Sequence, residues 1–135
     1  MSNKVNNIQL FDCYTAKILA RLYETFPRKQ NVFKDTFIDD CDSDLELKEK
    51  IDFVCDTLRF LKENGFITYK DYLKADNCNF QDMTLTLKGL SILNSEPLSI
   101  KNKETIGDKI VETVKNGAFA TASELTKQVI IKMIG

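Results

Sequence analysis

The fold of this chain is decided between Ser43 and Leu93, in the stretch SDLELKEKIDFVCDTLRFLKENGFITYKDYLKADNCNFQDMTLTLKGLSIL. Its opening Ser43-Asp44-Leu45-Glu46 has the S-x-x-E form of a capping box, in which a hydroxyl and a carboxylate bond the first free amides of a helix. Gly65 supplies the left-handed residue that commonly ends a helix. Together these signals predict a helix over residues 44–64.

Apolar residues within that helix recur at steps of four and three, which places them on one face. They are Leu47, Ile51, Val54, Leu58 and Leu61, and Phe53, Cys55 and Phe60 widen the stripe. We therefore expect one buried face, with Cys55 in the core.

After Gly65 the period changes to two, which is typical of strands. Residues 66–70 and 83–87 are predicted to form an antiparallel hairpin. The connection over residues 71–82 is rich in Asp and Asn and too long for a two-residue turn, so we expect a projecting loop. Residues 86–93 then continue as a short helix.

The first third of the chain carries another stripe at helical spacing, which predicts a helix over residues 11–26. Pro27 should end it, because proline cannot continue the hydrogen-bond ladder. A short second helix is expected over residues 32–39. The stripe residues of the first helix are Phe11, Tyr14, Ile18, Leu22 and Phe26, and those turned inward from the second are Phe33, Phe37 and Ile38.

A further helical region is predicted over residues 104–134, with Gly117 marking a bend or break. Its apolar stripe packs either on the first helix or across a homodimer interface; both alternatives remain open. A membrane-surface helix is disfavoured, because its polar face mixes both signs of charge. The residues expected to form the core or the dimer contact are Ile110, Val114, Ala118, Leu125 and Val129.

At 135 residues the chain is long enough to fold alone around its own core. We expect a mainly α protein with a small β-hairpin, of the α+β class. Its first domain should span residues 1–98, with a core over 9–95, and residues 99–135 should form a C-terminal helical extension.

Two segments, FLKENGFITYK and MTLTLKGLSIL, are similar to the helix, wing and post-wing helix of MarR- and PadR-like winged-helix regulators. The resemblance covers about residues 43–93. It implies a winged helix-turn-helix fold and DNA binding through the helix and the wing. The matching positions are Leu61, Gly65, Phe66, Ile67, Leu85, Thr86, Gly89 and Leu93.

Charge favours a different partner from the one that the resemblance implies. Residues 34–63 hold ten acids and five bases, a net charge of −5, whereas the rest of the chain is +4. DNA affinity comes largely from Lys and Arg beside phosphates. We therefore expect a protein partner with a basic surface, as an immunity protein or antitoxin covers a toxin. The acidic residues expected to bind it are Asp39, Asp40, Asp42, Asp44, Glu49, Asp52 and Asp56.

Two alternatives remain beside a protein partner. The same acids fit an ordinary solvated face without a partner. The chain could also be a DNA-binding transcriptional regulator. The bases that would then contact the nucleic acid are Arg28, Lys29, Lys48, Arg59, Lys70 and Lys74.

Catalysis has little support in this sequence, which has no histidine to serve as a base for a nucleophile. We expect no catalytic residues, no metal site and no cofactor. The four cysteines form no C-x-x-C pair, which favours reduced thiols. Neither a signal peptide nor a spanning helix is predicted, so we expect no membrane contact and a cytoplasmic location.

Overall fold

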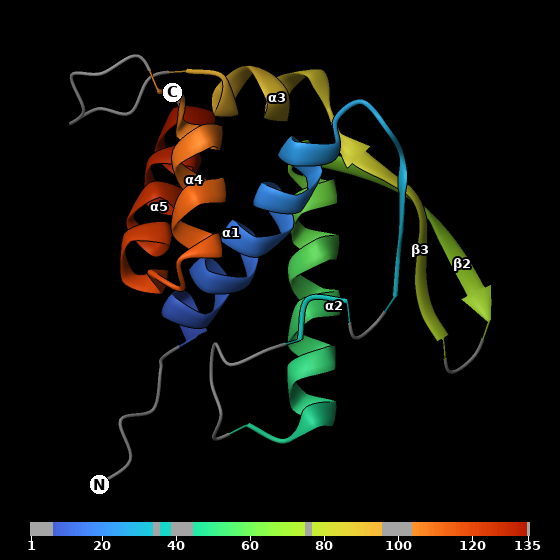
Figure 1. Ribbon diagram of the computed structural model, residues 1–135. Helices are drawn as coiled ribbons and strands as arrows, with labels where there is room; N and C mark the ends of the chain where they lie inside the picture. Colours follow the sequence, from blue (N-terminus) through green and yellow to red (C-terminus); the bar gives the residue numbers. More distant parts are fainter. Residues whose placement is uncertain (1–6, 34–35, 39–44, 75–76, 96–103, 135) are drawn as a thin grey trace, which may run out of the picture.

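The computed structural model describes residues 7–33, 36–38, 45–74, 77–95 and 104–134, which form helices and one antiparallel sheet (Figure 1). The strand order in the sheet is β1-β3-β2. The chain is therefore mainly helical with a small sheet, as expected for the α+β class. The elements in chain order are α1 (Asn7–Thr25), β1 (Gln30–Val32), α2 (Leu47–Glu63), β2 (Ile67–Lys74), β3 (Asn77–Leu85), α3 (Leu87–Leu93), α4 (Ile106–Lys115) and α5 (Phe119–Ile134).

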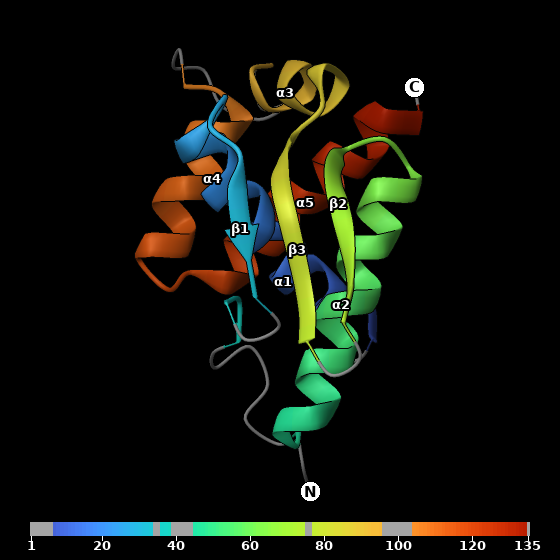
Figure 2. The same cartoon turned by 90° about the vertical axis from the view of Figure 1, so that its right-hand side faces the viewer.

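Helix α1 lies at the centre of the molecule, between the α4–α5 pair and the sheet (Figures 1 and 2). Leu10 and every residue from 12 to 20 are buried. Its neighbours are α2, α4, α5 and β3. As predicted, the helix ends just before Pro27, at Thr25.

Helix α2 was predicted over residues 44–64 and runs from Leu47 to Glu63. Its N-cap is Glu46, whose side chain makes no capping hydrogen bond, so the predicted capping box does not start this helix. Ser43 and Asp44 lie outside the described residues. The C-terminal signal is confirmed: Gly65 has a φ of 82°, and the Phe66 amide donates to the Leu61 carbonyl at 2.9 Å.

The hairpin is longer than its apolar segments predicted. Strands β2 and β3 stay paired as far as Lys74 and Asn77, so the expected loop over residues 71–82 is wrong. Strand pairing uses main-chain hydrogen bonds, which polar residues also form. Asp82, at a φ of 56°, lies where the register shifts, as the extra residue of a β-bulge does.

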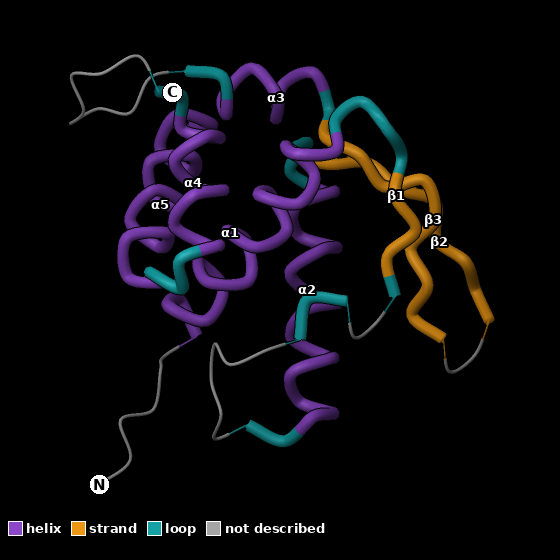
Figure 3. The backbone as a smooth tube through the Cα atoms, in the orientation of Figure 1, coloured by secondary structure: helices purple, strands orange, loops and turns teal. Residues whose placement is uncertain are grey.

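The predicted helix over residues 32–39 is also wrong at its start, because Val32 belongs to strand β1 and pairs with Phe80 of β3 (Figure 3). A buried β-branched side chain suits a strand, and Val32 is buried. Phe37 is buried within a turn, as expected, whereas Phe33, which was also expected to point inward, is 53% exposed. Residues 34, 35 and 39 lie outside the described part of the chain.

A tight turn joins β3 to α3 and contacts the short segment between α2 and β2. Thr86 caps α3: its hydroxyl accepts from the Gly89 amide at 3.0 Å, and its own amide donates to the Phe66 carbonyl at 3.0 Å. A Cβ at Gly89 would collide with that same carbonyl oxygen. Backbone of the two segments is therefore in direct contact, which only glycine allows.

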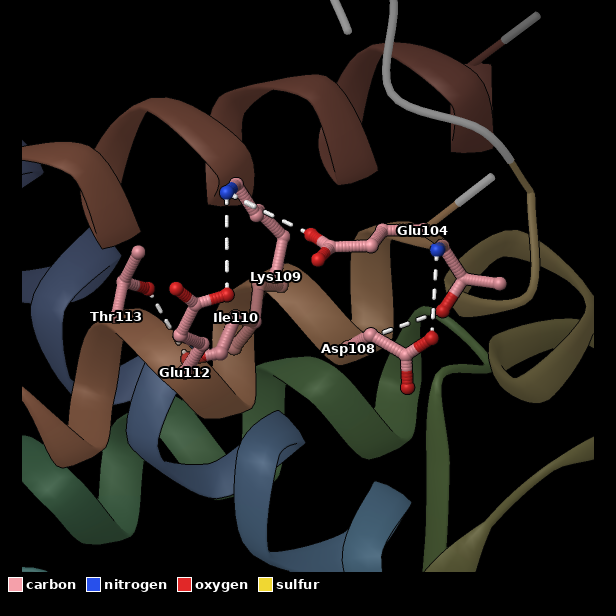
Figure 4. Close-up of polar contacts among 7 residues, drawn as sticks. Glu104, Asp108, Lys109, Ile110, Glu112 and Thr113 are labelled. Carbon is pink, nitrogen blue, oxygen red and sulfur yellow. Dashed lines mark hydrogen bonds and ion pairs between the residues drawn. The ribbon is translucent and has the colours of Figure 1, made fainter. Parts of the chain in front are cut away.

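Helix α4 begins with the capping box that α2 lacks (Figure 4). The Thr105 hydroxyl accepts from the Asp108 amide at 3.0 Å, and the Asp108 carboxylate accepts from the Thr105 amide at 3.4 Å. The Tyr23 hydroxyl of α1 hydrogen-bonds Thr105 at 3.0 Å and Asn94 at 2.9 Å. Its ring fills the space that a side chain at Gly107 would need.

The predicted break at Gly117 is confirmed, since α4 ends at Lys115 and α5 begins at Phe119. Helices α4 and α5 both pack against α1. Ile110, Leu125 and Val129 are buried there, Val114 is half-buried, and Ala118 is exposed and adds nothing to this core. Of the two alternatives for the C-terminal stripe, packing within the chain accounts for its buried members.

One cysteine departs from expectation. Cys13 of α1 is disulfide-bonded, so the prediction that the thiols are reduced is wrong at this position. The cysteines therefore no longer support the expected cytoplasmic location. Cys55 is buried in α2, as predicted. Across the described residues, every helix is too short or too polar to cross a bilayer.

Leu58 tests the core beneath α2, because its side chain is fully buried. Leu58→Ala should lower the free energy of unfolding by about 2 to 5 kcal/mol through lost burial and a cavity. Urea denaturation followed by circular dichroism measures the change. Leu47 was expected in the buried stripe, but at the first position of α2 it is 60% exposed, so that expectation is wrong. Leu47→Ala is therefore the matched control on the same helix, and its change should stay within about 0.5 kcal/mol. Equal losses at both positions would contradict this packing.

Candidate functional site

The outward face of α2 carries a row of carboxylates. Glu49, Asp52, Asp56 and Glu63 are all exposed and stand three, four and seven residues apart, so they follow one side of the helix. We call these four residues the acidic ridge. Of the acids expected to bind a partner, Glu49, Asp52 and Asp56 thus lie together on the exposed side of α2.

Two of the bases of α2, Arg59 and Lys62, are engaged in contacts of their own. Arg59 Nη1 lies 3.0 Å from Asp56 Oδ1, in an exposed ion pair of small energetic value. Lys62 Nζ lies 4.5 Å from the centre of the Tyr69 ring in β2, a cation–π contact. The middle of the outward face is therefore left to the acids.

The acidic excess of this region comes from the segment before α2. Residues 34–46 hold six acids and one base, whereas residues 47–63 hold four of each. Four of the seven predicted acidic site residues fall in that segment, outside the described residues: Asp39, Asp40, Asp42 and Asp44. Along α2 it is thus the placement of the acids, and not their number, that makes the face acidic.

The predicted nucleic-acid contacts are spread over three parts of the chain. Arg28 and Lys29 are exposed between α1 and β1. Lys48 and Arg59 lie at opposite ends of α2, about 16 Å apart along the axis for a rise of about 1.5 Å per residue. Lys70 of β2 pairs with Asp82 at 3.5 Å. Lys74 ends β2, and its side chain lies outside the described part.

A groove that the sequence did not predict lies between the first turns of α1 and the outer side of α2. Its volume is about 370 Å³, and its surface is mostly apolar. The rings of Phe11 and Phe60 meet edge to face, with centroids 5.4 Å apart. Its lining residues are Asn7, Ile8, Phe11, Phe53, Asp56, Thr57 and Phe60.

Two apolar side chains of this lining are exposed to solvent. Ile8 is 66% exposed and Phe60 is 45% exposed. Phe60 was expected to widen the buried stripe of α2, and that expectation is wrong. Counting helical positions could have found it, because Phe60 falls next to the acids and well away from Val54 and Leu58.

Within the described ranges, no group of three or more His, Cys, Asp or Glu side chains is placed to hold a metal ion. The exposed acids of α2 stand along the helix surface, and of them Asp56 lines the groove.

Comparison of the sequence with models of protein families found no match, and neither did searches for similar curated proteins or similar solved structures.

A buried carboxylate lies on the other side of the molecule, between α1 and α5. Asp12 is almost fully buried, and its Oδ2 finds no hydrogen-bond partner among the residues that the structure describes. Burial raises the pKa of Asp12; the nearby Lys127 lowers it in part, and Glu124 raises it further. The charged form of Asp12 is thus a cost to the folded chain at neutral pH.

Asp12→Asn should therefore stabilise the protein at pH 7. Because folding raises the pKa of Asp12, its favourable contribution is complete below the unfolded value and is lost as the pH rises through the folded value. The gain from Asp12→Asn should shrink to nothing near pH 3, where both states carry a protonated Asp12. Urea denaturation at the two pH values measures the difference.

Asp52→Asn is the matched control, since Asp52 is exposed on α2 and should give little change at either pH. Equal effects of Asp12→Asn at both pH values would contradict a cost of ionisation.

Proposed function

We propose that this chain is a non-enzymatic winged-helix recognition module whose acidic surface binds a protein with a basic surface, in the manner of an immunity protein or antitoxin. The observation that carries the proposal is the acidic ridge at the centre of the outward face of α2. Carboxylates at this position repel phosphates and attract Lys and Arg side chains.

The winged-helix part of the proposal rests on the order of the elements. Helix α2 ends at Gly65, a hairpin follows, and Thr86 and Gly89 turn the chain into α3. This order agrees with the helix, wing and post-wing helix of the MarR- and PadR-like regulators that residues 43–93 resemble. In such proteins α2 would be the helix presented to DNA, so its surface charge bears directly on the choice of partner.

Charge complementarity acts mainly on the rate and selectivity of binding. A negative surface steers a positive partner into encounter and disfavours partners of the wrong charge. The strongly acidic segment over residues 34–46 lies immediately before the ridge in the sequence and would extend the same field. The analogy to immunity proteins and antitoxins follows from this charge, because toxins that handle nucleic acids are commonly basic.

DNA binding as a transcriptional regulator is the second candidate. It is favoured by the exposed Arg28 and Lys29 and by the bases that flank the ridge, Lys48 and Arg59. Under this alternative, phosphate contacts would come from the edges of α2 and from the chain before β1, around an acidic centre.

Binding to random duplex DNA should be weak. At physiological salt we expect a dissociation constant poorer than the usual non-specific range of about 10⁻⁴ to 10⁻⁶ M, because the ridge opposes phosphate contact. Fluorescence anisotropy with labelled duplexes measures it. Sub-micromolar, sequence-dependent binding with a steep salt slope, lost on Arg59→Ala or on joint replacement of Arg28 and Lys29, would establish the regulator instead.

Reversing the charge of the ridge should abolish binding to a basic protein. We expect affinity capture with the wild-type chain to retain a basic partner that the triple variant Glu49→Lys, Asp52→Lys, Asp56→Lys does not retain. The matched control reverses three exposed acids elsewhere, Glu24, Glu112 and Glu124. It changes the net charge equally and should keep the partner. Equal loss in both triple variants would mean that only net charge matters and would refute a ridge-specific site.

A further inference from the structure

The apolar groove and the acidic ridge adjoin each other along α2. Phe53 and Phe60 stand seven residues apart, so they share one stripe of the helix, and the ridge forms the next stripe. Asp56 belongs to both, because it lines the groove and is a member of the ridge. A segment that fills the groove with apolar side chains therefore brings its neighbouring residues over carboxylates.

We propose that this groove binds an amphipathic helix of a partner protein, whose row of bulky apolar side chains is flanked by Lys or Arg. The inference rests on the proposed protein-binding function and names the part of the partner that is recognised. Amphipathic helices insert side chains at i, i+3, i+4 and i+7 into apolar grooves of this kind. An added β-strand would need an open sheet edge, and this groove lies between two helices.

The groove offers anchoring side chains that the fold itself leaves in water. Ile8 and Phe60 are the most exposed apolar members of the lining, and Phe11 and Phe53 are half-buried. Covering them removes apolar surface from water, which favours binding. Aromatic side chains in such a centre commonly carry a large share of binding energy.

A second copy of this chain fits the groove less well than a basic helix. Two-fold symmetry places the same patch of both copies together, so the two acidic ridges would meet. Arg59 is the base nearest to Asp56, and it already pairs with it. A small ligand also fits poorly, because the groove is open to solvent and does not enclose a ligand.

The test uses a fluorescein-labelled four-turn peptide with leucine at every third or fourth position and lysine elsewhere. Its affinity for the full chain is measured by fluorescence anisotropy over a range of salt. Ile8→Ser and Phe60→Ser should each weaken binding about tenfold or more, a loss typical of anchor residues. Leu87→Ser is the matched control: Leu87 is 81% exposed on α3, away from the groove, and its change should leave the affinity unaltered. Circular dichroism checks that each variant is folded.

Neutralising the ridge separates this inference from the function on which it rests. Asp52→Asn with Glu63→Gln should weaken binding and flatten its salt dependence, whereas Phe60→Ser should leave the salt dependence unchanged. If neutralising the ridge weakens binding and the groove variants do not, acidic recognition stands and the groove proposal falls. If neither set of variants affects binding, both fall.

Two further outcomes would also overturn the groove proposal. Equal binding of a matched peptide with glutamate in place of lysine would show that the groove does not require a basic partner. Sedimentation of the wild-type chain as a dimer that Phe60→Ser converts to a monomer would make a second copy the occupant.

Discussion

Burial of α1 on nearly every side is the constraint on which the other elements depend. A helical stretch without a solvated face, as residues 12–20 form here, is stable only when neighbours cover its whole circumference. Helices α4 and α5 cover one side of α1, and α2 and β3 cover others. The C-terminal helices are therefore part of the same core as the hairpin. The arrangement also encloses Asp12, and the Thr126 hydroxyl of α5 donates to the Asp12 backbone carbonyl at 3.2 Å.

The elements that the sequence predicted well are those specified by neighbouring residues. Pro27, Gly65 and Gly117 mark helix ends whose cause lies within a few residues, and the apolar stripe of α2 sets its buried face. The errors concern pairing between distant segments. Strand β1 exists because residues 30–32 find the edge of β3, some fifty residues later, and the hairpin extends because main-chain bonds do not require apolar side chains. The S-x-x-E signal predicted that the helix would start at residue 44, but α2 starts at Leu47, with Glu46 as its N-cap.

The same distinction between local and distant contacts separates the two parts of the candidate site. The acidic ridge follows from helical periodicity alone, since Glu49, Asp52, Asp56 and Glu63 fall opposite the buried stripe. The groove requires the first turns of α1 to meet α2, and Ile8 lies before the stripe that predicted the first helix. Phe60 shows the difference most clearly. Its apolar side chain predicts burial, but its angular position on α2 places it beside the ridge, where it is 45% exposed.

The two glycines in close contacts impose unequal limits on evolutionary change. At Gly89 the obstacle is the backbone carbonyl of Phe66, which no substitution elsewhere can make smaller. At Gly107 the obstacle is the Tyr23 ring, a side chain that can itself be replaced. Divergent descendants of this fold should thus keep glycine at the first position. At position 107, a residue larger than glycine should arise only together with a residue smaller than tyrosine at position 23. Positions 23 and 107 should therefore vary as a pair.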